Sequence, residues 1–130
     1  MKNISCVSVI SDTHGIIDPH IISYLKDSDV IIHAGDICST KIISDLKKYC
    51  KYVFLVAGNN DIPEKYFTSE DKNIIKELKK SLTININNKN ISIEHGDRYG
   101  HHANHAGLRE SYPDSEIIIY GHTHIQVCDQ

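Results

Sequence analysis

Short apolar runs that stop at a glycine and a polar side chain recur along this sequence. The first run leads into Asp12-Thr13-His14-Gly15, where a carboxylate and an imidazole stand two residues apart. On extended backbone, residues two apart point to the same face, so Asp12 and His14 would be presented together. A lone Asp-x-His motif is ordinary turn chemistry, because Asp and Thr also cap turns and helices. Recurrence favours a shared site, since five predicted strands end in polar candidates: Asp12 and His14, Asp36, Asn59, His95, and His122 with His124.

The predicted strands and helices alternate as in an α/β fold. Apolar β-rich runs predict strands over 4–10, 29–34, 52–57 and 116–120, and alternation predicts an antiparallel hairpin of 82–86 with 91–94. Helical spacing predicts helices over 16–27, entered through Asp18 and Pro19, and over 40–49. Between 63 and 80 the pattern fits either a short helix capped by Ser69 or a solvated connector. Because open α/β sheets bind ligands beyond the carboxyl ends of their strands, the polar candidates are expected at one sheet edge.

Length and charge restrict the class of protein further. The 130 residues suffice for one hydrophobic core and not for two, so we expect a single domain over 1–130. A net charge of -3 leaves no basic face for a polyanion, which disfavours nucleic acid as a partner. No apolar stretch approaches the length of a membrane span and no leader-like segment precedes Asp12, so we expect no membrane association and a cytoplasmic location. The four cysteines form no C-x-x-C pair and are expected to stay reduced.

The candidate ligands are carboxylates, an amide and imidazoles, without a thiolate. Such a set suits manganese, iron, cobalt, nickel or zinc in an open site, with manganese preferred, and argues against a closed structural zinc site. Seven ligands exceed what one ion needs, so we expect two divalent ions about 3.5–4 Å apart with Asp36 shared between them. Asp61 is expected to orient its neighbours without binding an ion. The residues expected to be catalytic are Asp36, Asn59, Asp61 and His95.

Together, five motifs resemble the calcineurin-like metallophosphoesterase superfamily, in particular its small single-domain phosphodiesterases. The motifs are Asp12-x-His14, Gly35-Asp36, Gly58-Asn59-x-Asp61, His95-Gly96 and Gly121-His122-x-His124. The resemblance implies a four-layer α/β/β/α sandwich. It also implies two ligand sets: Asp12, His14, Asp36 and His124 for one ion, and Asp36, Asn59, His95 and His122 for the other. The implied activity is hydrolysis of a small phosphodiester by a hydroxide that bridges the two metals.

Three features depart from the family pattern. Relatives often carry a histidine after the Gly-Asn pair that helps to protonate the leaving group, whereas this chain has Asn60. Many have a histidine where this chain has Asp97. Relatives also continue past the Gly-His-x-His motif, whereas this sequence stops at Gln130, with 125–128 expected to begin a strand. We therefore expect a C-terminally shortened fold with an unpaired sheet edge that is open to homo-oligomerisation.

Two other functions stay open on sequence grounds. The retromer small subunit resembles this family in fold but works chiefly as a protein-binding scaffold, so the fold alone does not establish catalysis. The filled ligand positions favour an enzyme, whereas Asn60 and the short end favour a scaffold. A helical His-Asp phosphohydrolase, suggested by His95-Gly96-Asp97, is disfavoured because its ligands would lie on helices. Of the remaining histidines, His33 is expected to pack behind Asp36 and His20 to lie on a predicted helix. His101, His102 and His105 are expected in a mobile segment at the rim of the site.

Overall fold

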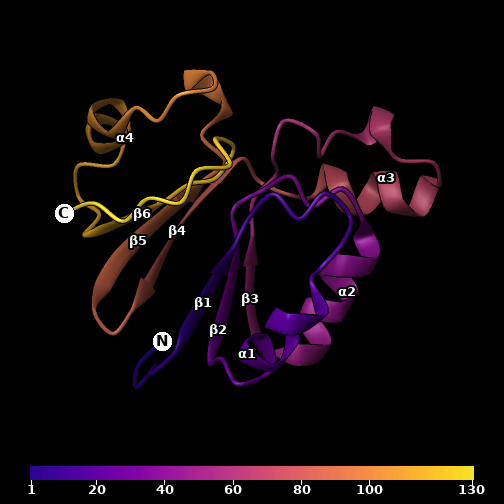
Figure 1. The fold of residues 1–130 in the computed structure, drawn as a ribbon, viewed down its shortest axis with the longest axis horizontal. Coiled ribbons are helices and arrows are strands. Elements are labelled where there is room, and N and C mark those ends of the chain that lie inside the picture. The colour runs from indigo at the N-terminus through magenta and orange to yellow at the C-terminus, as the bar shows by residue number, and fades with distance from the viewer.

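Two three-stranded sheets face each other in the computed structural model, which describes all residues from 1 to 130 (Figure 1). The first sheet is parallel, and its strands in spatial order are β1 (Val7–Ile10), β2 (Val30–His33) and β3 (Tyr52–Leu55). The strands of the second sheet, in spatial order, are β4 (Ser81–Ile86), β5 (Lys89–Glu94) and β6 (Ile117–Ile119). The central strand β5 pairs antiparallel with β4 and parallel with β6.

Helices cover the outer faces of both sheets (Figure 1). The first sheet is covered by α1 (Ile22–Lys26) and α2 (Thr40–Tyr49), with α3 (Ser69–Lys76) beside α2. The second sheet is covered by α4 (His105–Ser111). The predicted α/β/β/α sandwich is confirmed. No helix is both long and apolar enough to cross a lipid bilayer.

The central strand β2 belongs to two hydrophobic cores at once. Ile31 packs with Leu46 between the first sheet and its helices. Val30 and Ile32, on the opposite face, pack with Ile93 between the two sheets. A strand buried on both faces needs apolar side chains on both, which explains the unbroken apolar run of residues 30–32; the buried His33 that ends β2 is hydrogen-bonded instead.

The predicted hairpin is present, and its turn is tighter than expected. Asn87 and Asn88 alone connect the strands, with φ values of 50° and 62°. Asparagine tolerates this left-handed region better than most residues, and a two-residue turn of this kind matches the twist of the strands it joins. The hairpin brings β5, and with it His95, against β2.

Two predicted elements are shorter than expected. The strand predicted as buried over 4–10 begins only at Val7, and Val7 and Val9 are exposed because β1 lies at the edge of its sheet. The helix predicted over 16–27 is a 3-10 turn at Pro19–Ile21 followed by α1. Asp18 caps that turn as predicted, and its extended backbone is what the following proline imposes, so the helix does not begin earlier.

Three further differences come from local contacts. The segment 63–80 contains α3, and its capping residue is Thr68, which accepts a hydrogen bond from the Asp71 backbone at 3.0 Å, in place of Ser69. The strand expected over 125–128 is absent: Ile125 is exposed and no strand pairs with this segment. Helix α4 was not predicted, because only Leu108 of its residues is buried and its apolar periodicity is weak.

Candidate metal centre

The loops after β1 and β2 run side by side and carry the first three candidate ligands. The Asp12 amide donates to the Gly35 carbonyl at 2.9 Å, and the His14 amide donates to the Asp36 carbonyl at 3.0 Å. These hydrogen bonds continue the parallel ladder beyond the strand ends. They fix Asp12 and His14 beside Asp36.

The second sheet contributes the remaining histidines and is tied to the first sheet at the same place. The Gly121 amide donates to the His95 carbonyl at 3.0 Å, so the loops after β5 and β6 also lie together. Across the interface, the His122 amide donates to Asp12 Oδ2 at 3.0 Å, and His95 Nδ1 donates to the Ala34 carbonyl at 2.7 Å. The strand ends of both sheets therefore meet at one edge of the molecule, as the sequence predicts.

The backbone at this edge is strained. Five of the seven predicted ligands have φ between 46° and 72°: Asp12, His14, Asp36, His122 and His124. Residues with a side chain seldom occupy this left-handed region, and such strain persists where the surrounding structure holds it, most often at functional sites.

Glycines in the motifs allow the loops to approach each other closely. A Cβ atom at Gly121 would lie 1.9 Å from Ser11 Oγ and 2.6 Å from Asp12 Oδ2. A Cβ atom at Gly58 would lie 2.2 Å from both the amide nitrogen and Oδ1 of Asp36. Each carboxylate is thus packed against a glycine that no larger residue could replace without moving it.

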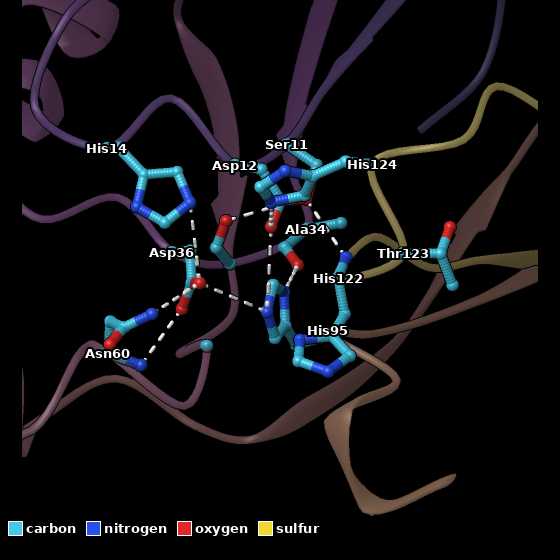
Figure 2. Close-up of polar contacts among 12 residues, drawn as sticks. Ser11, Asp12, His14, Ala34, Asp36, Asn60, His95, His122, Thr123 and His124 are labelled. Carbon is cyan, nitrogen blue, oxygen red and sulfur yellow. Dashed lines mark hydrogen bonds and ion pairs between the residues drawn. The ribbon is translucent and has the colours of Figure 1, made fainter. Parts of the chain in front are cut away.

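The ligand atoms gather into two groups that share Asp12 (Figure 2). Asp12, His14 and His124 form one group, and Asp12, Asp36 and His95 form the other; within each group the ligand atoms lie within 4.8 Å of one another. Asp36 Oδ2 lies 3.6 Å from His14 Nε2 and 3.5 Å from His95 Nε2, so it faces both groups. Two carboxylates, where the sequence indicated Asp36 alone, therefore stand between the groups.

Two buried polar atoms at the centre of this cluster have no hydrogen-bond partner, Asp12 Oδ1 and His95 Nε2, although His124 Nε2 lies 3.2 Å from Asp12 Oδ1. Because His95 Nδ1 donates to a carbonyl oxygen, Nε2 of the neutral ring presents a lone pair. That lone pair lies 3.7 Å from Asp12 Oδ1 and 3.5 Å from Asp36 Oδ2. Electron-rich atoms that face one another in a buried site are stabilised by a cation between them, and this donor set fits a divalent metal.

Asp36 is held in its charged form by Asn60. The backbone nitrogen of Asn60 donates to Asp36 Oδ1 at 2.9 Å, and its side-chain nitrogen donates to Asp36 Oδ2 at 2.7 Å. Burial of Asp36 raises its pKa, but these hydrogen bonds, together with the nearby His95 and His14 rings, hold the pKa below its ordinary value. The carboxylate is therefore ionised and available as a ligand at neutral pH.

Asp61 lies behind the candidate ligands and hydrogen-bonds to the loops that carry them. It is buried and accepts hydrogen bonds from the backbone amides of Ile37, Cys38 and Gly58 and from the Tyr66 hydroxyl, at 2.9–3.0 Å. One carboxylate thus joins the loop that carries Asp36 to the loop that follows β3.

His33 also lies behind the site. It is fully buried, its Nδ1 accepts from the Gly35 amide at 3.2 Å, and its Nε2 donates to Thr13 Oγ1 at 2.9 Å. Burial lowers the pKa of His33 to about 4, so the ring is neutral at physiological pH. The neutral tautomer links the loop of Asp12 to the loop of Asp36.

Two of the predicted ligands, His122 and Asn59, belong to neither group. The His122 ring stands beside them, with its centroid 5.1 Å from that of His95, and it stacks on His101 at 5.5 Å. Asn59 is exposed on the turn after β3, and its neighbour Asn60 contacts Asp36 instead. Of the rim histidines, His105 begins α4 and hydrogen-bonds to the Tyr120 hydroxyl.

Three residues near the site were missed by the sequence analysis. The sequence pointed to Asn60 only as the position where relatives carry a histidine. Because Asn60 directly precedes Asp61, a contact with the loop that carries Asp36 could have been suggested. Cys38, whose sulfur lies 3.8 Å from His14 Nδ1, and Lys65, which reaches Asn60, stand in segments without any motif. Burial and the neighbouring carboxylates of Asp61 and Asp36 raise the pKa of the Cys38 thiol to about 11, so it is a neutral thiol at physiological pH.

Comparison with known proteins identifies the family and agrees with the fold. A phosphodiesterase of Methanocaldococcus jannaschii is 27% identical over 134 residues, which cover 95% of this chain and 76% of the relative. Among solved structures, Vps29 from Entamoeba histolytica in complex with zinc has a TM-score of 0.76 at 21% identity, covering 97% of this chain and 68% of that one. An archaeal phosphodiesterase has a TM-score of 0.66 at 23% identity, covering 97% and 78% of the two chains. A family model for the calcineurin-like phosphoesterase superfamily domain matches residues 6–130, and the chain therefore belongs to that superfamily.

Proposed function

We propose that this chain hydrolyses phosphodiesters with the help of two divalent metal ions, manganese being the preferred ion. The observation that carries the proposal is the pair of buried, unpartnered atoms, Asp12 Oδ1 and His95 Nε2, at the junction of two ligand groups. The phosphodiesterase of M. jannaschii supports the class of reaction, because the similarity spans nearly the whole chain.

The protein's own residues would hold the ions and keep the site in shape. Asp12 and Asp36 supply negative charge, while His14, His95 and His124 supply neutral nitrogen ligands, and we assign His122 and Asn59 to complete the second ion's shell. Asp61 and His33 position the loops that carry these ligands. Bound divalent ions would supply an activated water, the bridging hydroxide expected from the sequence, and would neutralise charge on the phosphate.

Protonation of the leaving group has no histidine to perform it at position 60. The Asn60 side chain is committed to Asp36 and to Lys65, and an amide does not exchange protons as a general acid. The leaving group would therefore take its proton from water, and the enzyme should act best on esters whose leaving groups are stable as anions.

The proposal is tested with an activated substrate, bis(p-nitrophenyl) phosphate, and the purified chain. Activity should disappear with a chelator and return with manganese. Asp36→Asn should abolish most of it, since this carboxylate faces both ligand groups, whereas the same change at Asp45, which pairs with Lys41 on α2, should have no effect. Equal activity with and without chelator would contradict metal dependence.

A scaffold function is the second candidate, and one surface feature favours it. Val7 and Val9 are 36% and 50% exposed on the edge strand β1, so apolar side chains and unpaired backbone groups occur together there. A chain that binds metal but hydrolyses none of a broad panel of phosphoesters would favour this candidate. Homo-oligomerisation through a sheet edge, a cytoplasmic location and a single domain over 1–130 stay predictions.

A further inference from the structure

A cavity of about 410 Å³ opens beside the metal centre, on the side of His14. Its lining residues are His14, Cys38, Asn60, Lys65 and Tyr66. The volume lies within the range of small-molecule sites. None of the lining residues is a carboxylate, in contrast to the adjoining ligand groups, which contain Asp12 and Asp36.

Lys65 is the only lysine or arginine in this lining, and it has no acidic partner. Its ammonium group donates to Asn60 Oδ1 and forms no ion pair, not even with the adjacent Glu64. An ammonium group has three donors, so two of them are left without a protein acceptor. A free cation at the wall of a cavity attracts an anionic group of a ligand.

Asn60 sets the distance between Lys65 and the metal centre. Its side-chain oxygen accepts from Lys65 while its side-chain nitrogen donates to Asp36 Oδ2 at 2.7 Å. The Asn60 side chain therefore lies between the Lys65 ammonium group and the Asp36 carboxylate, with Lys65 on the outer side. A phosphate bound at the centre would occupy the inner position, and Lys65 would reach the next anionic group of the same molecule.

We propose that the cavity is a subsite for a second anionic group of the substrate and that Lys65 is the residue that contacts it. The preferred substrates are then small phosphodiesters that carry a further phosphate or carboxylate outside the scissile ester. This inference rests on the proposed phosphoesterase function, because it identifies the metal centre as the place of the scissile phosphate.

The test compares two chromogenic substrates that differ by one anion. They are the p-nitrophenyl ester of thymidine 5′-monophosphate and the same compound with a second phosphate on the 3′ hydroxyl. The chain should prefer the second compound in kcat/KM by up to about fivefold, which corresponds to the roughly 1 kcal/mol that a charge pair contributes at most at a solvent-exposed site. Lys65→Gln should remove the preference and Lys65→Arg should keep it. Lys65 is exposed, so neither change disturbs the core.

A matched control and a binding measurement separate this inference from the proposed function. Lys47→Gln removes the same charge from the last turn of α2, outside the cavity, and should leave the preference intact. Calorimetry should show the same Lys65-dependent preference for thymidine 3′,5′-bisphosphate over thymidine 5′-monophosphate, without any turnover, and metal content should be equal in all variants.

Each outcome decides one of the two ideas. A wild-type chain without preference, or a Lys65→Gln variant in which the ratio is unchanged because both substrates are affected equally, overturns the second-anion subsite. A Lys65-dependent preference in binding, with no hydrolysis of either compound, supports the subsite and refutes the phosphoesterase function.

Discussion

Replacement of Asp61 by asparagine should weaken both the fold and the metal centre, although Asp61 is not a predicted ligand. In the structure, Oδ1 accepts from the Cys38 amide and the Tyr66 hydroxyl, and Oδ2 accepts from the Ile37 and Gly58 amides. An asparagine keeps one oxygen and replaces the other with an NH2 group. Whichever way the amide is turned, at least one backbone donor then faces another donor.

The size of the effect follows from this count. A buried donor without an acceptor costs about 1–3 kcal/mol, and hydrogen bonds to a charged acceptor are stronger than those to a neutral one by about 1 kcal/mol. The hydroxyl of Tyr66 can rotate to accept from the new amide, so the least damaging orientation leaves one amide unsatisfied. We expect Asp61→Asn to lower the free energy of unfolding by about 3–5 kcal/mol, out of the roughly 5–15 kcal/mol typical of a folded domain.

Urea unfolding followed by circular dichroism measures this loss, and a manganese titration measures the second effect. The Ile37 and Cys38 amides belong to the loop that carries Asp36, so release of that loop should weaken manganese binding as well. Tyr66→Phe removes one donor and keeps the carboxylate, and should cost only about 1 kcal/mol. An Asp61→Asn chain within 1 kcal/mol of wild type and with unchanged manganese affinity would refute the role given to Asp61.

Three other predictions concern protonation, metal and packing. Lowering the pH from 6.5 to about 4 should remove up to about 3 kcal/mol of stability through His33, because the unfolded chain binds a proton there that the folded ring excludes. His33→Gln should reduce the slope of the unfolding free energy against pH, measured by urea unfolding at several pH values, by about one proton. An unchanged slope would contradict this role of His33. Free manganese at a hundredfold excess over its dissociation constant should add about 2.7 kcal/mol to the free energy of unfolding and raise the melting temperature. Equal melting temperatures with and without manganese would argue against the metal centre. Gly121→Ala should cost about 1–3 kcal/mol and reduce manganese affinity, because its Cβ would collide with Ser11 and the Asp12 carboxylate; calorimetric titration showing native affinity would disprove this.

Local chemistry alone accounts for much of what was predicted. The apolar run 30–33 is a strand, and helix 40–49 has the predicted bounds, because both signals depend on periodicity within the segment. The polar residues at the strand ends meet at one edge, since the carboxyl ends of parallel strands leave a sheet on the same side. The superfamily was recognisable from these residues and is confirmed.

Elements whose environment depends on the rest of the molecule were predicted less well. Val7 and Val9 are as apolar as Val30, yet they are exposed, because β1 has a neighbouring strand on one side only. The one local difference is Ser8, which interrupts the apolar run of β1, whereas residues 30–32 of β2 are apolar without a break.

The sequence by itself determined which residues could bind metal, and the tertiary structure decided how they face each other. That Asp12 belongs to both ligand groups, and that Asn60 contacts Asp36 while Asn59 is exposed, follows from hydrogen bonds between segments more than 20 residues apart. Lys65 lines a cavity only because the loop after β3 folds back toward His14. The physical reason is that the strand ends are set by local periodicity, whereas the path of each loop is set by long-range contacts that leave no pattern in the sequence.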